Sequence, residues 1–248
     1  MRHLSLHPGL AQQAYDAILD AICSGQLAPG SRIIQEDLAA RLAVSRQPVT
    51  QALLLLRKQG FLRETGRRSL IVAPLDAEEV RRVYAVRGVL DGLAARCAAE
   101  TNAQRAAAEG PELIAAGRKA VSDGAMQAMI AADIAFHRFL YELSGNPLIE
   151  ESASLHWQHI RRAMGGVLRR GDRPARVWDE HAAILAAVAA GACDEAERLS
   201  RRHAGQAATE LAAQLQAAAQ TQTEEADDRT PTGGNRHEVE SAADRRVS

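Results

Sequence analysis

The chain has 248 residues, 46% of them apolar, and carries 30 Lys and Arg against 31 Asp and Glu. This apolar content excludes a disordered chain, and the length suggests one or two domains. No apolar run reaches the roughly 18–20 residues of a membrane span, and the N-terminal segment lacks the apolar region of a secretory signal. Three widely spaced cysteines suggest neither a disulfide framework nor a thiolate zinc site. We therefore expect a cytoplasmic protein with no membrane segment.

The charge is unevenly distributed along the chain. Residues 1–75 hold nine Lys and Arg against five Asp and Glu, whereas the remainder is net negative. A basic N-terminal third followed by an acidic module is typical of a nucleic-acid reader with an appended domain. The charge imbalance is modest, so the assignment of nucleic-acid binding depends on the sequence motifs.

The first third predicts three helices followed by a β hairpin. Apolar residues recur at helical spacing over 10–24, 35–42 and 45–58, and two short strands are expected at 61–64 and 69–72. Ser45 is a plausible N-cap of the third helix. The apolar stripe of that helix is Val49, Ala52, Leu53 and Leu56.

The opposite face of the third helix predicts DNA recognition. In a helix-turn-helix, the second helix of the motif lies in the major groove, where Arg can pair with guanine and Gln with adenine. The candidate DNA-binding residues are Arg46, Gln47, Thr50 and Gln51 for bases, Arg57 for phosphate, and Arg67 and Arg68 at the hairpin tip. From spacing alone, a small packing module with an ordinary solvated face remains an alternative.

The segment LAPGSRIIQEDLAARLAVSRQPVTQALLLLRKQGFLRE resembles the winged helix-turn-helix of the GntR family of bacterial transcription regulators. The resemblance covers residues 10–74 and implies binding to a double-stranded DNA operator. Two positions depart from the family pattern: Thr50 replaces an arginine that contacts DNA, and Ser69 replaces a glycine of the wing. The usual family operator therefore cannot be assumed.

The remainder predicts an all-α bundle of six helices. Helical periodicity and the breaks at Gly, Asn and Pro place the helices at about 76–100, 103–122, 125–144, 147–170, 174–191 and 193–219. We expect a mainly α protein with a DNA-binding domain at 8–75, a helical domain at 76–220, and a disordered tail at 221–248.

Four polar residues fall on apolar helix faces and suggest a metal site. Asp133 and His137 are four residues apart on one helix, and His181 and His203 lie on the apolar faces of two others. Burying these groups is costly unless they are paired, and a divalent ion would satisfy all four. Such ligands suit zinc, which we favour, and also nickel, iron or manganese. For each histidine alone, a hydrogen-bonded core residue is the favoured interpretation.

The segment DIAFHRFLYELSGNPLI resembles the FCD effector-binding domain of the FadR-type branch of the GntR family. The resemblance implies that Asp133, His137, His181 and His203 hold a metal whose open positions take the carboxylate of a small organic acid. Six helices favour the shorter, VanR-like subgroup.

Two arginines are assigned to the effector. Arg87 lies on an inward helix face, where a guanidinium requires an anion, and the resemblance places an effector-binding arginine near this position. A structural pair with Asp91 or Asp133 is an equal alternative. Arg161 is the second candidate for the pocket.

These features together predict a homodimeric transcription repressor and not an enzyme. Effector binding would change the spacing of the two DNA-binding heads and so the operator affinity. A metal-dependent hydrolase and a pure metal sensor are the alternatives that the Asp/His set leaves open.

Overall fold

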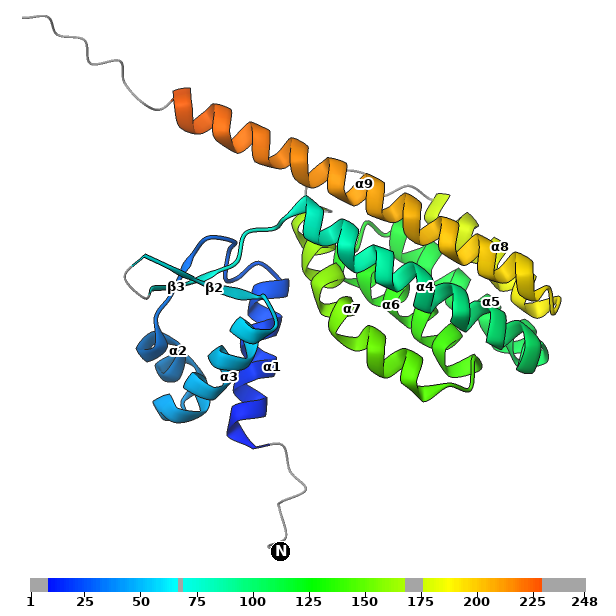
Figure 1. Ribbon diagram of the computed structural model, residues 1–248, viewed down its shortest axis with the longest axis horizontal. Coiled ribbons are helices and arrows are strands. Elements are labelled where there is room, and N and C mark those ends of the chain that lie inside the picture. The colour runs from blue at the N-terminus through cyan, green and yellow to red at the C-terminus, as the bar shows by residue number, and fades with distance from the viewer. Residues whose placement is uncertain (1–8, 67–68, 168–175, 229–248) are drawn as a thin grey trace, which may run out of the picture.

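A computed structural model describes residues 9–66, 69–167 and 176–228. The chain forms two packed units joined by residues 73–76 (Figure 1). The N-terminal unit, called the head below, contains α1 (Leu10–Cys23), β1 (Arg32–Ile33), α2 (Gln35–Leu42), α3 (Arg46–Lys58), β2 (Leu62–Thr65) and β3 (Ser69–Val72). The C-terminal bundle contains α4 (Ala77–Thr101), α5 (Ala103–Ser122), α6 (Met126–Leu143), α7 (Pro147–Val167), α8 (Arg176–Ala189) and α9 (Cys193–Asp228).

The head is built around the predicted apolar stripe of α3. Its four residues are at most 2% exposed and pack against α1 and the small sheet. Strands β2 and β3 form the expected hairpin, with Leu62 opposite Val72. The two-residue strand β1 adds to the outer edge of β3, giving the antiparallel order β1-β3-β2. This third strand was not predicted, since two residues carry no periodic signal.

The predicted mainly α architecture is confirmed, and six helices are described in the bundle. Close packing of α5 against α8 depends on small residues. A Cβ added at Gly117 would lie 1.9 Å from the ring of Trp178, so only glycine admits this indole. Trp178 in turn packs at a ring-centroid distance of 4.8 Å from His181. Gly117 therefore helps to position His181, a candidate metal-binding residue.

Two local expectations need correction. Ser45 occupies the N-cap of α3, but its side chain makes no capping hydrogen bond. The tail predicted as disordered from residue 221 begins as helix, because α9 continues to Asp228 (Figure 1). After Gly205 the chain has no proline or glycine before Pro231, and extending an existing helix is far easier than starting one. The rest of that predicted tail lies outside the described residues.

Within the described ranges, no helix combines the length and apolarity that crossing a membrane would require.

Candidate functional site

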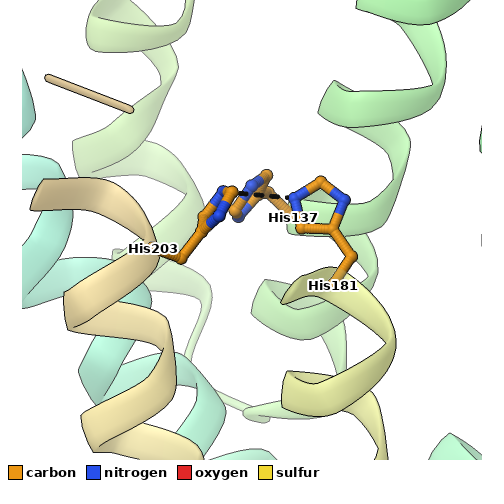
Figure 2. Close-up of side chains that lie close together, drawn as sticks. All are labelled: His137, His181 and His203. Atoms are coloured by element: carbon orange, nitrogen blue, oxygen red, sulfur yellow. Dashed lines mark hydrogen bonds between the residues drawn. The ribbon is translucent and has the colours of Figure 1, made fainter. Parts of the chain in front are cut away.

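Three helices of the bundle bring the four predicted polar residues into its interior. Asp133 and His137 lie on α6, His181 on α8 and His203 on α9, and none of them is more than 3% exposed. Figure 2 shows His181 and His203 pointing toward each other from their helices, with His137 beside them. The sequence spacing placed each residue on an inward face, and the packing of α6, α8 and α9 gathers them.

The histidine nitrogens are close enough to share one ion. Each of the three histidines offers a nitrogen within 4.8 Å of the others, and the Nε2 atoms of His181 and His203 are 3.2 Å apart. The Asp133 carboxylate lies 3.7 Å from Nε2 of His181. Two ligands on a tetrahedral zinc ion, each bonded at about 2.0–2.1 Å, lie about 3.3 Å apart. The donor types and the His181–His203 distance therefore fit a divalent cation, around which the remaining donors would move closer.

A carboxylate outside this group orients one of the ligands. Glu180 Oε2 lies 2.8 Å from Nδ1 of His203, which leaves Nε2 of His203 directed at the other histidines. This hydrogen bond also holds the pKa of Glu180 below its usual value. A carboxylate on the outer nitrogen is the usual support of a metal-binding histidine. Glu180 was not predicted, because its partner lies 23 residues away on another helix.

A second buried polar group adjoins the histidines. Arg87 Nε lies 2.9 Å from Oδ2 of Asp91, and the same oxygen is 3.5 Å from Nδ1 of His137. Tyr141 donates a hydrogen bond to the other Asp91 oxygen. The Arg87 guanidinium also lies 4.0 Å from the ring centre of Trp157. Burial is the largest influence and acts to lower the pKa of Arg87, but Asp91 together with Tyr84, Tyr141 and Asp133 outweighs it and keeps the guanidinium charged.

The guanidinium of Arg87 retains unused hydrogen-bonding capacity. The Arg87–Asp91 contact brings opposite charges together without good hydrogen-bond geometry, and among the described residues Nε and Nη2 of Arg87 have no hydrogen-bond acceptor. A buried N–H without an acceptor costs roughly 1–3 kcal/mol. The structural pair with Asp91 and two donors without an acceptor thus occur together at Arg87. The sequence predicted Arg87 as an effector-binding residue, with an ion pair to Asp91 or Asp133 as the alternative role.

Arg161 does not adjoin the histidines. Its guanidinium lies 2.6 Å from Asp20 of α1, on the face of α7 that meets the head. The apolar face of α7 that enters the bundle carries Trp157, Ile160 and Met164 instead. The assignment of Arg161 to the effector pocket is therefore corrected: its helix position turns it away from the bundle interior.

The predicted DNA-reading face of α3 is accessible. Arg46, Gln47, Gln51 and Arg57 are exposed and Thr50 is half-buried, beside a groove of about 420 Å³ between α3, α2 and the hairpin. Two of the arginines have acidic partners in the head: Arg46 lies 3.2 Å from Glu36, and Arg57 pairs with Glu64. The Thr50 hydroxyl donates to the Arg46 carbonyl. Arg67 and Arg68 lie outside the described residues.

Comparison with known proteins identifies both units. Residues 10–72 match the family described as bacterial regulatory proteins, gntR family, and residues 82–206, half of the chain, match the FCD domain. An uncharacterised HTH-type transcriptional regulator in an unstable DNA locus of Streptomyces ambofaciens is 29% identical over 183 residues, which are 72% of this chain and 75% of the relative.

Two further similarities cover most of the chain. The HTH-type transcriptional repressor RspR of Escherichia coli K12 is 23% identical over 199 residues, 77% of this chain and 84% of that protein. The solved structure of E. coli McbR/YncC has the same fold, with a TM-score of 0.71 at 23% identity over 84% of this chain and 99% of that one. These families and relatives are regulators, so the hydrolase alternative is set aside. The chain belongs to the GntR family of bacterial regulatory proteins, carries an FCD domain, and is a DNA-binding transcriptional regulator.

Proposed function

We propose that this regulator is a homodimeric repressor whose operator affinity is switched by a small organic acid bound at a divalent metal in the bundle. The observation that carries the proposal is the convergence of His137, His181 and His203 beside a buried arginine with free N–H groups. One chain thus carries candidate metal ligands, a positive charge for an acid, and a DNA-binding face.

The metal would be held by Asp133 and the three histidines, with zinc favoured over nickel, manganese or iron. Its chemistry there is that of a Lewis acid that offers positions to an oxygen ligand. The chain supports this role with Glu180, which fixes the ring of His203, and with Phe136, which stacks on His181 at 4.2 Å. Both supports orient nitrogen atoms toward a common point.

The effector would present a carboxylate to Arg87. The guanidinium fork matches a carboxylate in shape and charge, and the unused Nη2 donor supplies the hydrogen bond. Trp157 and Tyr84 flank the guanidinium and limit the space available to a compact acid. A small carboxylate would thereby offset the unpaired donor that the protein alone leaves buried.

DNA contacts are assigned to α3 and the hairpin as predicted, with Arg46, Gln47, Thr50 and Gln51 toward the bases. Arg57, Arg67 and Arg68 would contact phosphates or the neighbouring minor groove. Arg46 and Arg57 would exchange Glu36 and Glu64 for DNA. Exchange of exposed ion pairs costs little, because such pairs contribute about 0–1 kcal/mol.

A second copy of the chain would cover α4. Val86, Val89 and Leu93 form an exposed apolar stripe on this helix, 39–50% accessible. At its ends lie Arg82 and Glu100, which form no ion pair among the described residues. An antiparallel two-fold pairing of α4 with its copy would set Arg82 beside Glu100 of the partner subunit. The exposed apolar stripe of α4 and the opposite charges of Arg82 and Glu100 at its two ends favour a homodimer.

Repression is favoured because the relative RspR is named a repressor. The direct test is a fluorescence-anisotropy titration of the promoter next to the regulator's own gene, at saturating Zn²⁺, with a panel of small mono-, di- and tricarboxylates. One acid should weaken DNA binding at least tenfold, which is about 1.4 kcal/mol of coupling. Unchanged affinity across the panel would defeat the effector switch. A response to chelation alone would favour the pure metal sensor.

A further inference from the structure

Helix α7 contacts the candidate site with one face and the head with the other. Trp157 is buried in the bundle, where its ring lies 4.0 Å from the Arg87 guanidinium and 5.1 Å from the His137 ring. The other face of the helix, which carries His159, Arg161 and Arg162, turns toward the head. The same two turns of α7 therefore contact both the candidate metal site and the head.

The head-facing contacts are numerous and specific. His159 stacks on Phe61 with ring centres 4.3 Å apart, and its Nε2 lies 3.0 Å from the carbonyl oxygen of Gln59. Arg161 pairs with Asp20 of α1, and Arg162 donates to the carbonyl of Ala73 in the connecting segment. Gln59, the C-cap of α3, and Phe61 immediately precede the hairpin, so these contacts hold the end of the DNA-reading helix.

The backbones of α7 and α1 also approach each other closely, about one turn after Arg162. A Cβ added at Gly165 would lie 2.8 Å from the carbonyl oxygen of Cys23 in α1. The Cys23 thiol also donates to the carbonyl of Gln158, at 3.7 Å. Because backbone meets backbone here, α7 cannot rotate or slide without moving α1.

We propose that α7 transmits occupancy of the metal site to the DNA-binding head, with Trp157 as the receiving residue and His159 as the positioning residue that holds the end of α3. The proposal rests on the function proposed above and adds the route of its regulation. An ion that fixes His137, or an acid that draws Arg87, changes what Trp157 packs against. Since Trp157 and His159 are two residues apart on one helix, the change reaches Gln59 and Phe61 directly.

The test uses the full-length, metal-stripped protein and Zn²⁺ alone as the probe. Zn²⁺ affinity is measured by calorimetric titration, and the head is followed by amide hydrogen exchange in α1 and at residues 59–61. His159→Ala removes the ring stack and the hydrogen bond. Gly165→Ala displaces α1 from the other end of the contact. His159→Phe keeps the ring stack, and His156→Ala is the matched control on the same helix.

We expect Zn²⁺ to slow exchange in the head about threefold or more in the wild type, the control and His159→Phe. His159→Ala and Gly165→Ala should bind Zn²⁺ within about twofold of wild type but lose the response of the head. A head response that persists in both variants, or is absent from a wild type that binds Zn²⁺, overturns the role of α7. A wild type that does not bind Zn²⁺ overturns the metal-based function itself, and the coupling with it.

Discussion

The Nε2 atoms of His181 and His203 lie 3.2 Å apart in the bundle interior, although the residues are 22 positions apart in sequence. Two imidazoles in this arrangement can share only one proton between these nitrogens, and two protonated rings would repel each other. The pair is satisfied either by one N–H···N hydrogen bond or by a cation that accepts a lone pair from both rings. The separation therefore fits both arrangements, and loading with metal distinguishes them.

Removal of the supporting carboxylate should weaken metal binding. Glu180→Gln keeps the size of the side chain but loses the charge beside Nδ1 of His203. We expect Zn²⁺ affinity to fall about 10–100-fold. Competition with a chelator of known affinity measures the change. Glu195→Gln, an exposed acid on α9 paired with Arg198, is the control and should bind Zn²⁺ as the wild type does.

The buried Arg87–Asp91 pair should respond asymmetrically to mutation. Arg87→Met alone leaves the Asp91 charge buried and should cost about 3–5 kcal/mol of unfolding free energy. The double variant Arg87→Met with Asp91→Asn removes both charges and should recover part of that loss. Urea unfolding of the metal-free proteins provides the comparison. An Arg87→Met protein as stable as the wild type would refute a buried charge pair between Arg87 and Asp91.

His159 should make the metal-free protein sensitive to mild acid. Burial lowers the pKa of His159 below its ordinary value of 6.5, although Glu79, 3.8 Å away, opposes the shift and Arg162 adds to it. The folded protein therefore takes up this proton less readily than the unfolded chain. Its contribution to stability is complete above pH 6.5 and is lost as the pH falls toward the lowered pKa.

Unfolding free energies measured between about pH 7.5 and 5.5 should accordingly fall more steeply for the wild type than for His159→Phe. His156, whose pKa burial also lowers, is present in both proteins, and its charge adds to the lowering at His159 in the wild type. Parallel profiles would show that His159 is not held neutral at the head.

Restoration of the family arginine on α3 should strengthen DNA binding. Thr50→Arg places a cation on the half-buried position beside Arg46 at the DNA-reading face. If it contacts a phosphate, affinity should rise and the slope of log K against log salt should steepen by about 0.9. Anisotropy titrations at several salt concentrations test this, with Arg57→Ala, at the arginine of α3 assigned to phosphate, expected to change both quantities in the opposite direction. An unchanged slope in both variants would remove α3 from the DNA interface.

The proposed dimer face can be tested by charge exchange. Arg82→Glu should repel Glu100 of the partner subunit and weaken the dimer, and a second change, Glu100→Arg, should restore it. Leu93→Glu should dissociate the dimer outright. Light scattering after size-exclusion chromatography gives the mass. Leu148→Glu, at a position 64% exposed on α7, serves as the control; a wild type of monomer mass would exclude this use of α4.

Periodicity predicted most of the local structure. The bundle helices end within a few residues of the predicted limits at every described boundary except the C-terminal end of α9, and Val49 and Leu56 are fully buried as expected. Inward placement of Asp133, His137, His181 and His203 followed from the same helical spacing. Local pattern sufficed because these features depend on which face of one helix is apolar.

The features that the sequence did not predict depend on contacts between distant segments. Strand β1 exists only through its pairing with β3, and Glu180 acquires its role from His203 on another helix. His159 contacts Phe61 across the two units, a role that no local pattern in the sequence indicates. Arg161 was misplaced for the same reason, since nothing local distinguishes a side that faces the bundle from one that faces the head.

The most direct test of the account is a crystal structure of the Zn²⁺-loaded protein with the ion located by anomalous scattering. We expect one anomalous peak per chain, at about 2.0–2.1 Å from one nitrogen each of His137, His181 and His203 and within bonding distance of Asp133. Absence of a peak among these side chains, or an ion bound elsewhere while the three imidazoles bond only to protein groups, would contradict it.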